Sequence, residues 1–290
     1  MASHGAGVAR FPGDRKHVMK ETIIRPTRGW GAPDLRELWE SRDLIRFFVL
    51  RDVKVRYRQT FFGAVWAVVP PLFTMIIFTF VFTKVVSVPS DGMPYWAFSL
   101  RALTPWSYFV QALPSTANSV VSSVGMVSKV YFPRLVLPVT ASLGPLVDLA
   151  VAFVFLLIAL ALAGFLPGPR LIFVIPFTLI AVMTVLGVGS LFAAVNVLYR
   201  DVKHVVPLAT QLWLFATPVV YPSSLLPESV RPLLGLNPMA GVVEGYRWAL
   251  LGGDANPWPL VAVSALSATL ILVGALFVFR RIERVFADVI

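Results

Sequence analysis

The chain has 290 residues, 57% of them hydrophobic and 14% charged, and its mean hydropathy of +0.78 is far above that of an ordinary soluble domain. It contains no cysteine, which excludes disulfides, thiolate metal sites and cysteine nucleophiles. The net charge of +10 does not indicate a nucleic-acid partner, because 13 of the 25 lysines and arginines fall in residues 1–60 and no basic groove interleaved with aromatics is visible.

The N-terminal part of the chain is basic and divides into two segments. Residues 1–34 are polar and punctuated by proline and glycine, which predicts a flexible tail. Residues 35–60 predict an amphipathic helix, because Ile45, Phe48 and Val49 share one face and the basic residues that follow share another. Such a helix before a membrane span lies in the interface plane. It serves either as an anchor on anionic lipid headgroups or as a docking surface for a partner.

Long uncharged runs dominate the rest of the sequence. Arg58 and Lys84 enclose 25 uncharged residues, and the 29 residues between Arg170 and Arg200 are also uncharged. A bilayer core of about 30 Å needs roughly 20 apolar helical residues, so each run is long enough to cross it. The pattern predicts an all-α membrane protein with one transmembrane domain over 61–282. Its six spans are expected at about 61–84, 95–117, 137–164, 171–197, 205–222 and 258–279.

Several of these segments carry interruptions. Pro70 and Pro71 fall in the first third of the first span, where neighbouring helices must satisfy the freed backbone groups. The second span contains Gln111, Ser115 and Thr116, whose polarity indicates a face against protein or water. A short amphipathic helix is expected in the loop 118–136. The segment 223–257 holds two apolar stretches that are too short to cross, which predicts re-entrant helices or a helical pair on the external surface.

The distribution of positive charge predicts the orientation. Six spans place both termini on one side of the membrane. With that side cytoplasmic, and with only basic residues from Arg42 onward counted, 13 lysines and arginines lie inside and 5 outside. Positively charged residues near span ends favour the cytoplasmic side. We therefore expect a multi-pass protein with both termini in the cytoplasm.

Sequence motifs for catalysis are missing. There is no GxxxxGK[ST] run, no HExxH, and the three histidines are scattered outside the spans. No DxD pattern supports a membrane-embedded glycosyltransferase. Asp148 is the clear ionisable group near the middle of a predicted span, and a buried acid there is a candidate functional site. It either lines the path of an ion-coupled carrier or bonds to a neighbouring helix and holds the bundle in register. Without several such acids, the energy for transport is expected from a partner.

Several motifs resemble the permeases of type-2 ABC exporters, most closely the branch that exports O-antigen, galactan, capsule or teichoic-acid chains. The resemblance covers about residues 35–282 in order. The matching stretches are Arg51-Asp52-Val53-Lys54-Val55-Arg56-Tyr57, then Gln59-Thr60, Gly63, Trp66 and Pro70, Lys129 to Arg134, Asn196, Tyr199 to Val202, Pro218 to Pro222, Asn237-Pro238-Met239, Glu244, Tyr246 and Arg247. One departure is Arg101, which stands where relatives carry a small uncharged run and leaves the path of the second span open.

The resemblance implies a homodimer of permeases in the bacterial inner membrane, each docked on a cytoplasmic ATPase subunit that carries the ATP and magnesium. This chain would then be a transport subunit, with neither cofactor nor metal of its own. The expected ATPase-interface residues are Arg51, Asp52, Lys54, Arg56, Lys129, Tyr131 and Arg134. The segment 223–257 resembles an external gate, with Asn237, Glu244 and Arg247 as its polar residues. Glu244 and Arg247 stand at i and i+3, so they could pair on one helix or form an ordinary helix-surface pair.

The cargo implied by the resemblance is a lipid-linked polysaccharide. Aromatic faces suit its conduit, because they pack on the C–H edges of sugars while the sugar hydroxyls stay hydrated. Candidate lining residues are Trp66, Phe73 and Phe80 at seven-residue spacing, together with Trp213 and Tyr221. Aromatic rings also form lipid-facing belts and bundle contacts. The rival readings are a type-2 exporter of a drug or lipid and an ion-coupled carrier using Asp148.

Overall fold

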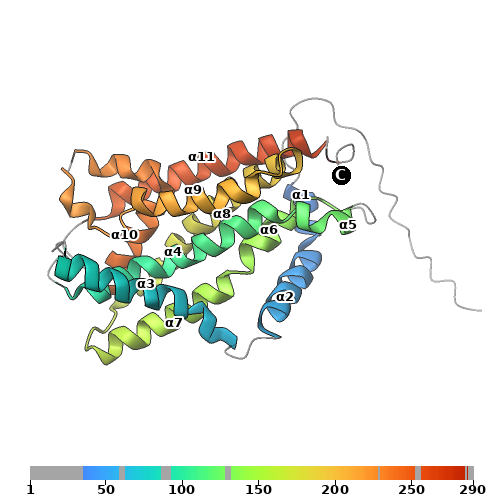
Figure 1. The fold of residues 1–290 in the computed structure, drawn as a ribbon. Helices are drawn as coiled ribbons and strands as arrows, with labels where there is room; N and C mark the ends of the chain where they lie inside the picture. Colours follow the sequence, from blue (N-terminus) through green and yellow to red (C-terminus); the bar gives the residue numbers. More distant parts are fainter. Residues whose placement is uncertain are drawn as a thin grey trace, which may run out of the picture.

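The computed structural model describes residues 35–58, 63–85, 93–127, 132–227, 229–251, 256–284 and 286. Within these ranges the regular structure is helical, with no strand. Figure 1 shows an elongated bundle in which α3, α4, α6 with α7, α8, α9 and α11 run alternately in opposite directions. The helices α1, α2 and α5 and the last turns of α11 lie at one end, called here the α2 end. The helix α10 lies toward the other, called the α10 end.

The α-helices are α1 (Leu35–Glu40), α2 (Arg42–Arg58), α3 (Val69–Phe80), α4 (Tyr95–Asn118), α5 (Val124–Val127), α6 (Val136–Leu143), α7 (Leu146–Leu162), α8 (Val174–Leu198), α9 (Val202–Ala216), α10 (Pro238–Leu251) and α11 (Trp258–Glu283). Shorter helical turns are η1 (Gly63–Ala67), η2 (Val81–Val85), η3 (Val121–Ser123), η4 (Pro169–Phe173), η5 (Ser223–Leu225) and η6 (Arg231–Leu236). The start of the chain, 1–34, lies outside the described residues.

Four helical segments are long and apolar enough to cross a membrane, within the described part of the chain. They are Gly63–Val85, Val136–Leu162, Pro169–Leu198 and Trp258–Glu283. They correspond to the first, third, fourth and sixth predicted spans. The segments predicted as spans 2 and 5 form helices that miss this criterion, so the number of crossings stays a prediction.

The second and fifth predicted spans differ from the others for different reasons. The helix α4 has 24 residues and is therefore about 36 Å long, but it is more polar than the four apolar segments. The helix α9 has 15 residues, or roughly 22 Å, and ends at Ala216 because Thr217 turns the chain into an extended conformation. A helix of that length reaches across a bilayer core only together with the extended chain that follows it.

Prolines mark the breaks between helical segments. Pro70 and Pro71 occupy the first turn of α3, where the missing N–H groups have no helical acceptor to lose. The third predicted span is divided at Gly144 and Pro145 into α6 and α7, and Pro145 stands directly before the first residue of α7. The chain therefore changes direction inside what the sequence presents as one apolar run.

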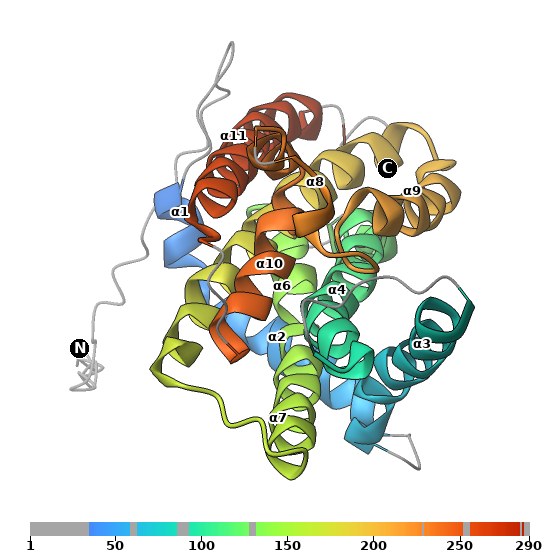
Figure 2. The ribbon, with the colours of Figure 1, turned by 90° about the vertical axis from the view of Figure 1, so that its left-hand side faces the viewer.

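The helix α4 lies at the centre of the bundle. It packs against α3, α6, α7, α8, α9 and α10, and Figure 2 shows it set between α3 and α9 when the bundle is viewed end on. Tyr108, Phe109 and Leu113 are completely buried along it. Close approach to α8 requires a glycine, because a Cβ on Gly189 would lie 2.5 Å from Cγ2 of Thr116. Central burial explains why α4 tolerates polar residues.

A second, smaller core joins the segments at the α2 end. Phe48 of α2 packs there with Val136 and Leu137 of α6, Ala193 of α8 and Phe279 of α11. The start and the end of the described chain therefore meet at the same end of the bundle. This arrangement is what an even number of crossings requires; the side of the membrane on which the end lies stays a prediction.

Candidate functional site

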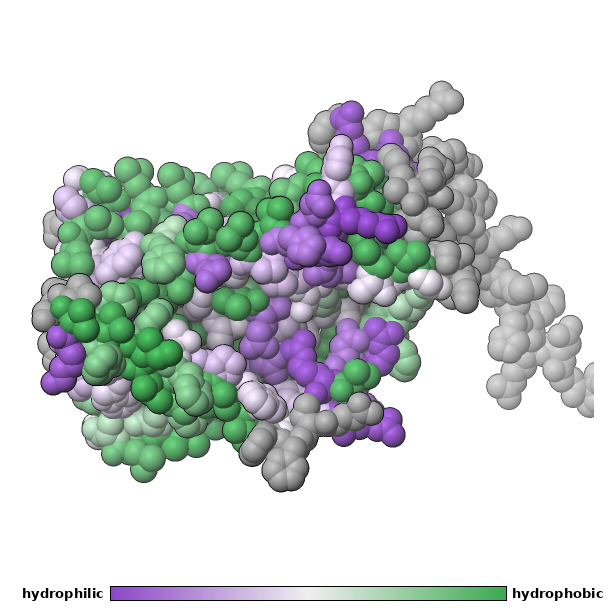
Figure 3. Space-filling model, viewed as in Figure 1, coloured by the Kyte–Doolittle hydropathy of each residue, from purple (hydrophilic) through white to green (hydrophobic). Residues whose placement is uncertain are grey.

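The helix α2 has one face against the bundle and one face exposed. Phe48 is 5% exposed, whereas Arg51 and Lys54 lie on the surface. Arg51 donates to Oδ1 of Asp52 from Nη2 at 2.8 Å and from Nε at 3.0 Å. Figure 3 shows hydrophilic surface gathered toward the α2 end of the molecule. The segment 35–60, expected as one amphipathic helix, is divided at Ser41 into α1 and α2, and α2 turns its charged side outward; residues 59–60 lie outside the described residues.

Asp148 ties α2 to the first turn of α7. Its side chain is 6% exposed and accepts a hydrogen bond and ion pair from Nη1 of Arg56, whose side chain is 36% exposed. The hydroxyl of Tyr57 donates to the other carboxylate oxygen. Two successive residues near the end of α2 thus hold one buried carboxylate. We call Arg56, Tyr57 and Asp148 the α2 latch.

The latch favours the structural alternative for Asp148 and identifies its partner. In the sequence this acid stands near the middle of an apolar run, but the break at Gly144 and Pro145 places it at a helix start beside the end of α2. Its carboxylate is bound to the interface helix, not to a second span. Within the described residues, no group of three or more histidine, aspartate or glutamate side chains is placed to hold a metal ion.

The phenol of Tyr57 is held in its protonated form. The pKa of Tyr57 is raised to about 12, first by burial, then by the hydrogen bond to the Asp148 carboxylate and by the negative charge of that group, while the positive charge of Arg56 lowers it. The tyrosine is therefore a hydrogen-bond donor to Asp148 throughout the physiological pH range.

One face of α4 is partly exposed and polar. Ser107, Gln111, Ser115 and Asn118 follow one another at helical spacing and are partly exposed in an otherwise buried helix. We call these four residues the α4 stripe. Thr116 differs from them, because it is buried and donates to the carbonyl of Ala112 at 2.7 Å. The polar residues of this segment were expected to face protein or water. Thr116 faces protein, whereas Gln111 and Ser115 are partly exposed.

The helices on either side of the α4 stripe turn apolar side chains outward. On α3, Phe73 is 61% exposed and Phe80 66%. On α9, Leu208 is 59% exposed and Phe215 65%. In Figure 3, a band of pale and hydrophilic surface lies between green areas above and below it. The α4 stripe is therefore a polar strip bordered by exposed apolar side chains of α3 and α9.

The predicted aromatic lining residues fall into two groups. Trp66, Phe73 and Phe80 are all more than half exposed on η1 and α3, so they point away from their own bundle. Trp213 is half-buried, packs edge to face on Phe109 with ring centroids 5.1 Å apart and donates from Nε1 to Oδ1 of Asn237 at 2.8 Å. Their role in lining a channel stays a prediction.

The predicted gate residues lie in or beside α10, which is buried among α4, α8 and α11. Asn237 joins α9 to α10: its Nδ2 donates to Oγ1 of Thr217 at 2.9 Å, and its Oδ1 accepts from the N–H of Met239 at 3.1 Å. Tyr221, predicted as a lining residue, is partly buried after α9. Burial of α10 inside the bundle favours a re-entrant segment over a pair of surface helices.

Two arginines are buried at the α10 end. The side chain of Arg247 is 7% exposed and donates to Oε1 of Glu244 at 2.7 Å, so the pair is not an ordinary helix-surface pair. Arg247 also donates to the carbonyl of Val219 at 2.8 Å and stacks 3.7 Å above the ring of Phe98. Arg101, which left the path of the second span open, lies inside α4 and donates to the carbonyl of Arg247 at 3.1 Å. This network was missed by sequence reasoning, because the two arginines are 146 residues apart.

The remaining predicted interface residues are placed in part. Lys129 and Tyr131 lie outside the described residues. Arg134 donates from Nη1 to the carbonyl of Glu283 at 2.6 Å and lies 5.5 Å from the ring centroid of Phe286. It therefore secures the end of α11, at the same end of the molecule as α2.

Comparison with known proteins agrees with this architecture. The O-antigen export system permease protein RfbA of Myxococcus xanthus is 32% identical over 254 residues, which cover 86% of this chain and 96% of the relative. An RfbA permease of Klebsiella pneumoniae is 25% identical over 86% of this chain and 95% of its own length. The polysialic acid transport protein KpsM of Escherichia coli is 24% identical over 70% of this chain and 80% of its own length.

A family model extends the agreement across most of the fold. The model described as ABC-2 type transporter matches residues 43–251, from the start of α2 to the end of α10. The matched region includes the α2 latch, the α4 stripe and the buried arginines at the α10 end. The chain belongs to the ABC-2 type transporter family of membrane proteins.

Proposed function

We propose that this chain is the permease subunit of an ATP-driven exporter that moves a lipid-linked polysaccharide, of the O-antigen, galactan or teichoic-acid type, across the bacterial inner membrane. The observation that carries the proposal is the likeness to a named O-antigen export permease over 86% of this chain and 96% of that relative. The alignment covers nearly the whole length of that relative, so the proposal concerns the entire permease and not one segment of it.

The energy source is proposed to be a separate cytoplasmic ATPase. The sequence has no P-loop, and the exposed charges of α2 offer a surface for docking. A movement of α2 reaches the bundle through the latch, because Arg56 and Tyr57 hold Asp148 of α7. Nucleotide-driven closure of the partner would then be transmitted to the third span. A change of state needs contacts that differ between the two states, and α2 is where we place them.

The path is proposed to form between two copies of the chain. Each copy brings the α4 stripe, bordered by the outward faces of α3 and α9. Pairing of these faces covers large exposed side chains such as Phe73 and Leu208 where they meet, and leaves the polar stripe facing the space between the copies. The α10 segment would close the external end, and both termini would lie in the cytoplasm.

A charge-reversal experiment tests the docking surface. Arg51→Glu and Lys54→Glu are expected to abolish copurification with the ATPase subunit while membrane insertion is unchanged. Lys84→Glu is the matched control, because it reverses an equally exposed charge where the chain leaves α3, away from α2. Normal copurification and export by the α2 variants would overturn the assignment of α2 as the docking surface.

Two further measurements test the cargo. Deletion of the gene is expected to remove the surface polysaccharide, and added glycan is expected to stimulate ATP hydrolysis by the purified complex. An intact surface polysaccharide together with lost drug or lipid export would replace the proposed cargo. Transport that continues in the purified chain without ATP would replace the mechanism by that of a secondary carrier.

A further inference from the structure

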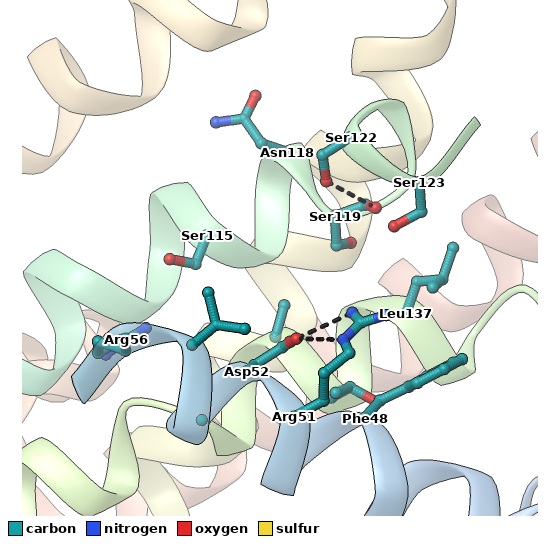
Figure 4. Close-up of a pocket in the computed structure, with 14 residues that line it drawn as sticks. Phe48, Arg51, Asp52, Arg56, Ser115, Asn118, Ser119, Ser122, Ser123 and Leu137 are labelled. Atoms are coloured by element: carbon teal, nitrogen blue, oxygen red, sulfur yellow. Dashed lines mark hydrogen bonds and ion pairs between the residues drawn. The ribbon is translucent and has the colours of Figure 1, made fainter. Parts of the chain in front are cut away.

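A polar cavity lies where α2, the end of α4 and α6 meet. Its volume is about 660 Å³, within the roughly 300–1,000 Å³ typical of ligand sites. Figure 4 shows Ser115, Asn118, Ser119, Ser122 and Ser123 on the α4 and η3 side. The facing wall comes from α2 and α6. The docking surface and the latch use residues of α2, but neither gives a role to the cavity itself. The full set of lining residues is Phe48, Arg51, Asp52, Val55, Arg56, Ser115, Asn118, Ser119, Ser122, Ser123, Leu137, Thr140, Ala141 and Gly144.

Four hydroxyl groups of this cavity have their protons committed to the backbone. Ser115 donates to the carbonyl of Gln111 at 2.9 Å, and Ser119 to that of Thr116 at 2.7 Å. Ser122 donates to the carbonyl of Ser119 at 3.1 Å, and Thr140 to that of Val136 at 2.8 Å. A carbonyl oxygen only accepts, so in each pair the hydroxyl is the donor. What remains on these oxygens is lone pairs.

This wall therefore offers acceptors to a ligand. Each hydroxyl oxygen has two acceptor lone pairs. Asn118 is balanced by comparison: its Nδ2 donates to the carbonyl of Pro114 at 3.0 Å and its Oδ1 accepts from Nδ2 of Asn196 at 2.9 Å, which leaves one N–H and one lone pair. A ligand that binds against these hydroxyl oxygens supplies O–H or N–H donors. Sugar hydroxyls do so, whereas a phosphate group is an acceptor.

The guanidinium groups of the cavity do not reverse this conclusion. Each is held by a carboxylate: Arg51 pairs with Asp52 at 2.8 Å, and Arg56 pairs with Asp148. Two positive and two negative charges leave the site close to neutral. A site for a diphosphate or another polyanion would need an excess of positive charge, as charge-assisted pairs with phosphate require. Val55, Leu137 and Ala141 add apolar surface against which C–H groups pack.

From this geometry we infer that the cavity is a binding site for neutral sugar units, one or a few glycosyl residues of the exported chain, at the α2 end of the α4 stripe. The inference rests on the proposed function and deepens it. Ser115 and Asn118 belong both to the cavity and to the stripe, so a glycan bound here continues directly onto the polar face of α4. The site takes the sugar part of the cargo and leaves its phosphate-linked lipid outside.

The absence of cysteine allows a direct test by labelling. Ser122→Cys places the single thiol of the chain in the cavity, and Ser41→Cys places one between α1 and α2, outside the cavity and outside the predicted spans. Ser41 is the matched control because its hydroxyl also donates to a carbonyl one turn earlier, at 2.9 Å. The purified complex in lipid nanodiscs is treated with a water-soluble maleimide, and the rate of labelling is followed. Ser123→Cys is the second reporter where Ser122→Cys fails to accumulate.

Three probes distinguish the ligand classes. They are neutral oligosaccharides of two to four units released from the cells' own surface polysaccharide, inorganic pyrophosphate, and a polyprenyl diphosphate without sugar. The oligosaccharides are expected to slow labelling of the cavity thiol severalfold and to leave labelling of the Ser41→Cys thiol unchanged. Replacing Ser115 by alanine as well removes one acceptor and is expected to weaken this protection by roughly three- to tenfold.

Either of two results would overturn the inference: protection by pyrophosphate or the polyprenyl diphosphate in place of the sugar, or no protection by any probe. Failure of the inference is separable from failure of the proposed function. When deletion of the gene removes the surface polysaccharide but oligosaccharides leave the labelling rate unchanged, the exporter stands and the cavity assignment falls.

Discussion

Breaking the α2 latch should uncouple α2 from the bundle without unfolding the bundle. The two sides of the ion pair are unequally buried, since the side chain of Asp148 is 6% exposed and that of Arg56 is 36% exposed. Arg56→Gln leaves the Asp148 carboxylate buried without its guanidinium. Asp148→Asn leaves an arginine that can turn into water. Arg56→Gln is therefore expected to weaken the packing of α2 against its own bundle more than Asp148→Asn does.

The magnitudes follow from burial. Removal of one partner of a buried ion pair costs about 3–5 kcal/mol. The pair here is half accessible through Arg56, so we expect about 3 kcal/mol for Arg56→Gln and about 1–2 kcal/mol for Asp148→Asn. Each 1.4 kcal/mol changes an equilibrium tenfold, so Arg56→Gln raises the undocked fraction of α2 more than a hundredfold. The double variant should cost less than the sum, because neither charge is then left alone.

Two assays follow the latch. Hydrogen exchange of the α2 amides in nanodiscs reports docking of the helix, and ATP hydrolysis with glycan export reports coupling. Arg56→Gln is expected to speed exchange in α2, to leave exchange in α4 and α8 unchanged, and to separate hydrolysis from export. Partial recovery in the Arg56→Gln, Asp148→Asn double variant is the decisive result. A double variant as inactive as Asp148→Asn alone, with unchanged exchange in α2, would refute the latch and favour a carrier that needs the carboxylate itself.

Three further outcomes can be checked by thermal unfolding of the purified protein. The Tyr57 hydrogen bond should stabilise the protein fully below pH 10, the ordinary pKa of tyrosine, and lose this effect as the pH rises toward the raised pKa of about 12; a Tyr57→Phe variant that keeps the same alkaline decrease would contradict this. Gly189→Ala should destabilise by about 1–3 kcal/mol because its Cβ would lie 2.5 Å from Cγ2 of Thr116, whereas Gly274→Ala, with open space around its Cβ, should not. Arg247→Met should cost about 3 kcal/mol by leaving Glu244, whose side chain is only 17% exposed, without its partner, and adding Glu244→Gln should restore part of it; equal melting temperatures of all three proteins would exclude a stabilising pair.

The helical segments could be predicted from the sequence where apolar composition alone decides them. The four long apolar segments agree within a few residues with the predicted spans, for example Pro169–Leu198 with the predicted 171–197. In the fifth predicted span, 205–222, the helix runs from Val202 to Ala216 and ends inside an uncharged run, and the crossing itself stays a prediction. Hydropathy reports whether a segment is apolar enough for a membrane. It does not report the backbone conformation, so it could not predict the extended conformation of Thr217 that ends the helix.

The polar contacts of the site could not be predicted, because they depend on tertiary distance. Arg56 and Asp148 are 92 residues apart, and each has an ordinary local explanation. The polar face of α4 was visible in Gln111 and Ser115, but its extension into a cavity needed the position of α2 and α6. One signal in the sequence did indicate a contact of this kind. Burying the Asp148 carboxylate in an apolar run costs free energy, so the acid was expected to have a polar partner, although the sequence did not show which one.

The latch and the cavity are parts of one device, because they share a helix. Of the 14 residues that line the cavity, α2 supplies Phe48, Arg51, Asp52, Val55 and Arg56. A rigid displacement of α2, as proposed for docking of an ATPase, therefore changes the cavity, because it moves one wall relative to the serines of α4. The same displacement changes the distance between Arg56 and Asp148, the ion pair of the latch. Sugar binding on the α2 end of the path and motion of the docking helix are then coupled by geometry, without any relay through the rest of the bundle.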